Sequence, residues 1–115
     1  MEKIVEQGLL YDFYGELLTD HQKQIYEAAV YNDMSLTEIA DENGISKQGV
    51  HDLIKRCTAT LQGYEDRLHM IRRFEAIKSD AEEMSRLSKD SDGVSYDEFK
   101  EKMSLISDKI LEELT

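Results

Sequence analysis

Residues 46–56 gather side chains whose chemistry suits contact with nucleic acid. The amide of Gln48 can pair with adenine, and Lys47 or His51 can bond guanine, while short polar and basic side chains can hold phosphates. Residues 46–58 contain three basic residues and one acidic residue, a local charge of +2 in a chain of net charge −11. The predicted nucleic-acid contacts are Ser46, Lys47, Gln48, His51, Asp52, Lys55 and Arg56.

These polar residues belong to a longer pattern, LTEIADENGISKQGVHDLIK at residues 36–55, that is typical of a helix-turn-helix motif. Ala40 is small enough for the second helix to approach, Gly44 permits the sharp turn, and Ser46 can cap the second helix. Asn43 stands at a site that is usually apolar. The predicted core of the motif consists of Ile39, Ala40, Gly44, Ile45, Val50 and Leu53.

The overall charge leaves alternatives open. With 14 Lys and Arg against 25 Asp and Glu, most of the surface should repel an anionic partner, and phosphate neutralisation provides much of the affinity of DNA-binding proteins. DNA contact by the motif is the first hypothesis. RNA or protein contact by the same motif, and a purely structural role, remain open.

The composition predicts an all-α fold, because the chain has no Pro and six Gly and its apolar residues recur at helical spacing. Expected helices cover residues 4–18, 20–32, 36–43, 46 onward and 99–114. Thr19, Ser35, Ser46 and Ser95 are the expected N-caps, because each side chain can accept a backbone N–H.

The helix that begins at Ser46 carries an apolar stripe of period 3.5 as far as Ile71, beyond which the phase slips. The slip indicates a bend, a break or a change of packing partner near residues 72–80, and an unbroken helix to Leu87 would be about 60 Å long. The last helix either folds back as an antiparallel hairpin or pairs with a second subunit. A homodimer is the favoured prediction and a monomeric bundle the alternative. The predicted dimer seam consists of Ile54, Cys57, Leu61, Tyr64, Leu68 and Ile71.

Two regions follow from these patterns. Residues 1–73 are predicted to form the helix-turn-helix domain with the start of the long helix. Residues 74–115, with twelve acids and six bases, are predicted to form an acidic helical extension that serves packing or dimerisation.

Other chemistry has little support, so we expect no catalytic residues, no metal, no cofactor and no enzyme. Placing Gly93 at the sixth position of a calcium loop puts Phe99 at the twelfth, where a carboxylate is required. The single Cys57 lies in the apolar stripe. Neither a signal peptide nor a membrane-spanning run is present, so a cytoplasmic protein without membrane insertion is expected.

Residues 8–75 resemble the YlxM-type helix-turn-helix family of Gram-positive bacteria, which is itself similar to region 4 of sigma factors. The segments that carry the resemblance are DFYGELLTDHQ, SLTEIADENGISKQGV and YEDRLHM. The resemblance implies a sigma-region-4-like bundle followed by a long helix and a C-terminal amphipathic helix. Because family members are typically encoded beside genes for the signal recognition particle and its receptor, it also implies a regulatory or accessory role in protein targeting. That role is either DNA-binding regulation or binding to the particle's RNA or GTPase subunit.

Overall fold

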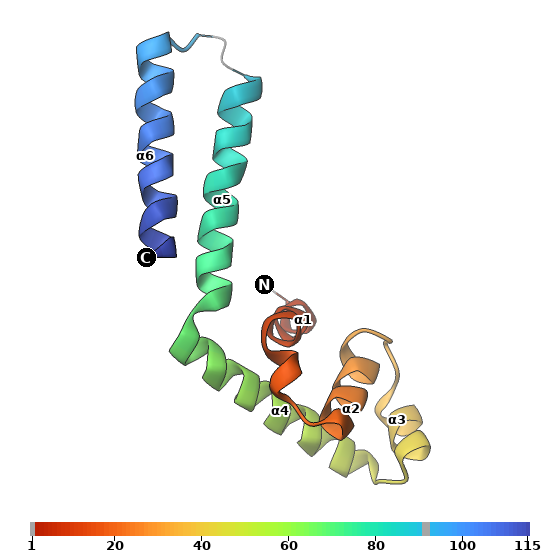
Figure 1. Cartoon of the computed structure of the whole chain (residues 1–115). Helices are drawn as coiled ribbons and strands as arrows, with labels where there is room; N and C mark the ends of the chain where they lie inside the picture. The colour runs from red at the N-terminus through yellow and green to blue at the C-terminus, as the bar shows by residue number, and fades with distance from the viewer. Residues whose placement is uncertain (1, 91–92) are drawn as a thin grey trace. The chain divides into compact units, whose positions relative to one another are not determined.

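The computed structural model describes residues 2–90 and 93–115, and all regular structure within these residues is helical (Figure 1). The all-α prediction is confirmed. The elements are α1 (Lys3–Tyr14), a 3₁₀ turn η1 (Gly15–Leu17), α2 (Asp20–Val30), α3 (Leu36–Asn43), α4 (Lys47–Leu68), α5 (Met70–Lys89) and α6 (Tyr96–Leu114).

The chain divides into two compact units, one ending at His69 and one beginning at Met70. The boundary that the sequence suggested, after residue 73, falls inside α5. Each unit is described separately below.

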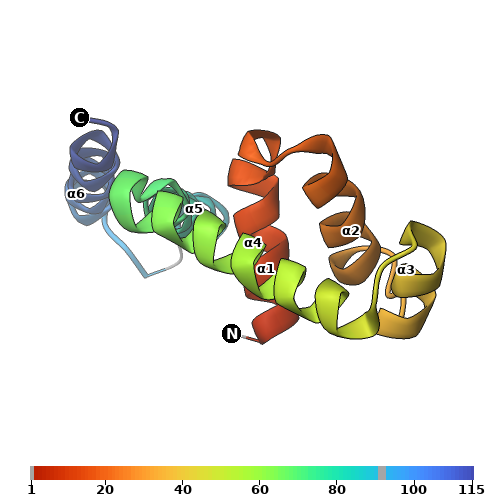
Figure 2. The same cartoon turned by 90° about the horizontal axis from the view of Figure 1, so that it is seen from below.

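In the first unit, α1, α2 and α3 all pack against α4, which crosses them as the longest helix (Figures 1 and 2). The centre of this packing is a cluster of small and branched side chains from α2, α3 and α4. Its buried members are Ile25, Ala28, Ile39, Ala40 and Val50. Tyr14, Tyr26, Cys57 and Leu61 extend the buried core toward α1.

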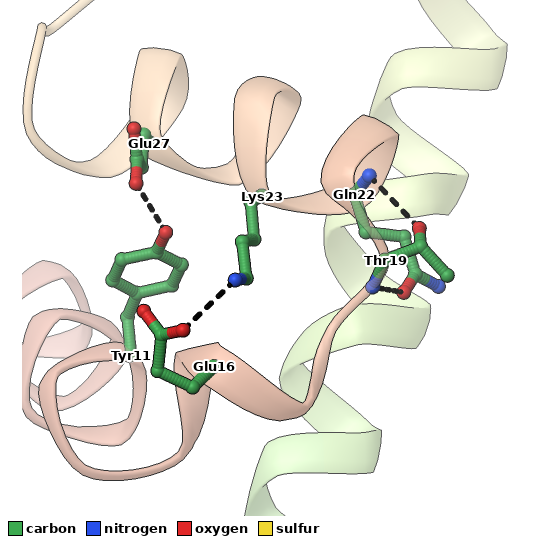
Figure 3. Close-up of polar contacts among 6 residues, drawn as sticks. All are labelled: Tyr11, Glu16, Thr19, Gln22, Lys23 and Glu27. Carbon is green, nitrogen blue, oxygen red and sulfur yellow. Dashed lines mark hydrogen bonds and ion pairs between the residues drawn. The ribbon is translucent and has the colours of Figure 1, made fainter.

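The N-caps lie where the sequence predicts them. The Thr19 hydroxyl accepts from the N–H of Gln22 and the Gln22 side chain accepts from the N–H of Thr19, which forms a complete capping box (Figure 3). Ser35 and Glu38 form the same arrangement at α3. Ser46 and Ser95 cap α4 and α6 through their hydroxyls. At four helix starts, a side chain from the same short stretch of sequence therefore satisfies a backbone donor.

The first helix is shorter than predicted. It ends at Tyr14 rather than Leu18, and Gly15–Leu17 continue as a 3₁₀ turn. A Cβ at Gly15 would lie 2.8 Å from ring atoms of Tyr11, so only glycine lets the chain tighten against that ring. The tightened turn buries Leu18 and leaves Leu17 exposed.

The break in the long helix lies earlier than predicted. Residues 72–80 are continuous helix within α5, whereas α4 ends at His69, which adopts the left-handed conformation with φ 56° and ψ 27°. The His69 N–H donates to the carbonyl of Glu65 at 2.8 Å and closes the last turn of α4. Of the bend, break or change of packing partner that the phase slip indicated, the structure shows a break, and it lies outside residues 72–80.

The predicted dimer seam needs a correction at two positions. Cys57 and Leu61 are 1% and 0% exposed, because helices of their own unit cover them. These two side chains therefore have no surface to offer a second subunit. Ile54, Tyr64 and Ile71 are half-buried and Leu68 is exposed, and their role in a seam stays a prediction.

The second unit is a helical hairpin in which α6 packs against α5 (Figure 1). The sequence allowed two arrangements for the last helix, and the structure has the one in which this helix folds back as a hairpin. Ile106 is the one fully buried side chain among its described residues, flanked by half-buried Phe99, Met103 and Ile110. Leu105, Leu111 and Leu114 are more than half exposed. The hairpin thus has a thin core and apolar side chains on its surface.

Within the described residues, no helix is long and apolar enough to cross a membrane. The same residues contain no group of three His, Cys, Asp or Glu side chains arranged to hold a metal ion. Asp92, which would be the fifth residue of the calcium loop considered above, lies outside the described residues.

Candidate nucleic-acid interface

The turn between α3 and α4 has the geometry of a helix-turn-helix. Gly44 ends α3 with φ 65° and ψ 30°, and the Ile45 N–H donates to the carbonyl of Ala40 at 3.2 Å. Ser46 then caps α4, its hydroxyl accepting from the N–H of Gly49 at 3.0 Å. Two residues therefore separate the end of α3 from the cap of α4, and the angle between the helices is fixed by backbone and cap hydrogen bonds.

The side chains predicted to form the motif core lie between the two helices. Ile39 and Val50 are 0% exposed, and Ala40 is 6% exposed. Ile45 and Leu53 pack against the same cluster while half-buried. Asn43 is accommodated because its side-chain amide donates to the carbonyl of Ile39 at 2.8 Å, which satisfies a polar group at a site that is usually apolar.

The predicted contact residues lie together on the outer face of α4 and at its cap. Each of them, from Ser46 to Arg56, is exposed. A surface hollow on this face is lined by Gly49, Asp52, Lys55, Arg56 and Ala59. The backbone that carries these side chains is rigid, because the opposite face of the same turns packs into the core.

Asp52 organises the two side chains best suited to read bases. Its Oδ1 accepts from the Gln48 amide at 3.0 Å and lies 3.6 Å from Nδ1 of His51. One carboxylate therefore bonds Gln48 and lies next to the ring of His51 on the exposed face of α4. It is also an acceptor of the kind that cytosine N4 requires in a major groove.

The basic side chains of the face are available to an anionic ligand. Among the described residues, no carboxylate oxygen lies within 4.0 Å of a side-chain nitrogen of Lys47, Lys55 or Arg56 on this face. The same is true of Lys3 on α1. Lys23, by contrast, is paired with Glu16 at 3.1 Å on another part of the unit (Figure 3). Phosphates could bind to the α4 cations without displacing an internal partner.

A polar centre behind this face was not predicted from the sequence. Thr58 donates its hydroxyl hydrogen to the carbonyl of Ile54 at 2.9 Å, so its oxygen accepts from the Gln7 amide at 3.3 Å and the Tyr26 hydroxyl at 2.9 Å. Through Thr58, α4 is tied to α1 and α2. In the sequence, Thr58 is a hydroxyl residue next to the apolar stripe. Such residues are too common to predict a buried polar contact.

A second surface hollow, of about 540 Å³, lies where α1 meets α4 and also escaped prediction. Its lining includes Lys3, Gln7, His51, Lys55 and Gln62. Lys3 stands more than thirty residues before the motif, so only the packing of α1 on α4 reveals that it is near the predicted contacts.

Two tyrosine–carboxylate hydrogen bonds fasten α1 to α2. Tyr11 donates to Glu27 (Figure 3), and Tyr31 donates to Asp12. Burial, supported by these hydrogen bonds and nearby negative charge, raises the pKa of Tyr31 to about 12 and also raises the pKa of Tyr11. Burial also raises the pKa of the Cys57 thiol, which makes this thiol a poor nucleophile at neutral pH.

Comparison with known proteins agrees with the geometry. Residues 1–106 match the family described as "Putative helix-turn-helix protein, YlxM / p13 like". A UPF0122 protein of Thermoanaerobacter sp. (strain X514) is 41% identical over 106 residues, covering 92% of this chain and 85% of the relative. One from Symbiobacterium thermophilum is 48% identical over 71 residues, 62% of this chain and 66% of the relative. One from Bacillus pumilus is 41% identical over 91 residues, 79% and 83% respectively.

Proposed function

The chain belongs to the YlxM/p13-like helix-turn-helix family, and we propose that it binds duplex DNA by placing the N-terminal half of α4 in the major groove. The carrying observation is the exposed row of Lys47, Gln48, His51, Asp52 and Lys55 on a helix whose other face is locked into the motif core. Gln48, His51 and Asp52 would read base edges, and Ser46, Lys47, Lys55 and Arg56 would hold phosphates.

DNA is the preferred duplex for a geometric reason. The major groove of B-DNA is about 12 Å wide and admits an α-helix of about 10–12 Å diameter. The major groove of an A-form RNA duplex is deep and narrow, so side chains on a helix cannot read it. A protein whose candidate contacts all lie on one helix face therefore suits DNA better than duplex RNA.

Selection from a random duplex library tests this proposal. We expect one sequence class to be enriched, and its binding to weaken when Lys47, Lys55 and Arg56 are replaced together by Ala. The salt dependence of log K should then become shallower by about 0.9 for each lost phosphate contact. The matched control replaces Lys23, Arg67 and Arg86 by Ala, which removes the same charge elsewhere. No enrichment, with binding weaker than about 1 μM at moderate salt, contradicts DNA recognition.

A second candidate is an accessory role at the signal recognition particle, on its RNA or its GTPase subunit. The observation that favours the GTPase subunit as the partner is the acidic balance: residues 1–69 hold thirteen acids and six bases, and residues 70–115 hold twelve acids and eight bases. Such surfaces suit a basic protein better than bare duplex. Affinity capture with and without nuclease distinguishes the two: recovery of the particle's RNA or GTPase supports this role, and recovery of neither argues against it.

The proposed DNA-binding form is a homodimer that pairs through the second unit. The α5–α6 hairpin buries only Ile106 among its described residues, and two helices with so small a core gain stability from a further apolar cover. A dimer would present two α4 helices to an inverted repeat whose half-sites lie about 34–36 Å apart, or a multiple of that spacing.

A further inference from the structure

We propose that Lys3, at the start of α1, is a phosphate-binding residue of the DNA interface and holds the backbone on the side of α4 away from Arg56. This inference rests on the proposed function and extends it to a residue outside the helix-turn-helix. The ligand is a phosphodiester group of the DNA strand that borders the groove occupied by α4.

The first support is the position of Lys3 beside the predicted contacts. Lys3 lines the same 540 Å³ hollow as His51 and Lys55, two residues of the α4 face. Among the described residues, the lining of this hollow contains no carboxylate. Glu6, the acid in the first turn of α1, is not part of it. The hollow therefore combines two ammonium groups and an imidazole, a set that suits an anion, while the amides of Gln7 and Gln62 already donate to Thr58 and Asp66.

The second support is the way α1 is anchored. One turn after Lys3, the Gln7 amide donates to Thr58 of α4 at 3.3 Å, and Gln7 is 91% covered. Lys3 thus projects from a helix end that is fixed against α4. Figure 2 shows α1 crossing α4 with its N-terminal end reaching past that helix. Little conformational freedom of the backbone would be lost when Lys3 binds.

The third support is the distribution of charge around α4. At about 100° per residue, His51 and Thr58 lie about 40° and 60° to one side of Lys55, whereas Arg56 lies about 100° to the other side. The hollow with Lys3 is on the His51 and Thr58 side. Because a helix in the major groove runs between two sugar–phosphate backbones, it needs cations on both flanks. Arg56 serves one flank, and Lys3 continues the row begun by Lys47 on the other.

Replacing Lys3 by Gln tests the inference on the DNA selected above. We expect binding to weaken by about threefold to tenfold and the salt dependence to become shallower by about 0.9, the effect of one lost phosphate contact. Lys3→Arg should retain affinity. Lys23→Gln is the matched control, because Lys23 is paired with Glu16 and lines neither hollow on α4. Unchanged circular dichroism and thermal unfolding would exclude a folding defect.

A scan of single neutral methylphosphonates along the duplex gives the sharper result. Neutralising the phosphate that Lys3 contacts should weaken the wild-type protein and leave the Lys3→Gln variant unaffected. An equal effect in both proteins at all positions overturns the inference. So does Lys3-dependent binding to an RNA duplex of the same sequence without such dependence on DNA.

The two proposals fail in different ways. If Lys3→Gln binds like the wild type while the Lys47, Lys55 and Arg56 variant loses affinity, DNA binding by α4 stands and the role of Lys3 is wrong. If the wild-type protein binds no duplex DNA, both proposals are wrong.

Discussion

At the scale of single residues, the hydroxyl of Thr58 has the most partners in the candidate interface. It donates to Ile54 and accepts from Gln7 and Tyr26, so one side chain of α4 bonds both α1 and α2. Tyr26 is 0% exposed, and water cannot replace Thr58 as the partner of its hydroxyl. Buried polar groups that lose their partner destabilise a fold more than the missing hydrogen bond alone would suggest.

Replacing Thr58 by Val should lower the free energy of unfolding by about 1–3 kcal/mol, because the Tyr26 hydroxyl and the Gln7 amide are left unpaired. Urea unfolding followed by circular dichroism measures the loss. Thr60→Val is the control, since the Thr60 hydroxyl is exposed and bonds only the carbonyl of Arg56. Adding Tyr26→Phe to Thr58→Val should recover part of the stability. Equal losses at positions 58 and 60 would contradict this account.

At the scale of helices, starts were easier to predict than ends. The caps at Thr19, Ser35 and Ser46 follow from local hydrogen-bond chemistry that a short stretch of sequence contains in full. The end of α4 at His69 has no such signal, because a left-handed histidine replaces the expected glycine or proline. The slip of the apolar stripe indicated a bend, a break or a change of packing partner, and gave neither its kind nor its residue.

The candidate site also has a part that the sequence predicts and a part that it does not. The motif core and the exposed face of α4 could be predicted because both repeat at helical spacing within twenty residues. Lys3 and Thr58 could not, because their roles depend on the packing of α1 on α4 between positions far apart in the chain. The spacing of apolar residues along one helix does not specify which distant helix packs against it.

The contact between α1 and α2 should make the first unit sensitive to alkali. The folded state raises the pKa of Tyr31 from 10.0 to about 12, chiefly through burial and then through the Asp12 carboxylate. The folded protein therefore holds the phenolic proton more tightly than the unfolded chain. This stabilisation is complete below pH 10 and is lost as the pH rises from 10 toward 12.

We expect the midpoint of urea unfolding to fall between pH 9 and pH 11. Because Tyr11 shifts in the same direction, the double variant Tyr11→Phe/Tyr31→Phe should show a smaller fall than the wild type over this interval. Absorbance at the phenolate band gives an independent titration of the same groups. An unfolding midpoint with the same pH dependence in both proteins would rule out these two tyrosines as the cause.

At the scale of the whole molecule, the burial of Cys57 and Leu61 leaves α4 with little apolar surface for a subunit contact. The α5–α6 hairpin is the better candidate, because Leu111 and Leu114 are 55% and 67% exposed. They lie about 140° and 80° round α6 from the buried Ile106, on one side of the helix. Leu105 is also exposed but lies about 100° round the other side. The surface containing Leu111 and Leu114 is therefore the predicted dimer contact.

Replacing Leu111 and Leu114 together by Glu should convert a dimer of twice 13.3 kDa into a monomer of 13.3 kDa in light scattering. Two buried carboxylates at the contact would be unpaired, whereas in the monomer both stay in water. The first unit should keep its helical circular dichroism, and affinity for an inverted repeat should fall toward that for a single half-site. Leu105→Glu is the control and should remain dimeric. A wild-type mass of 13.3 kDa that does not change with concentration would show that the chain works as a monomer.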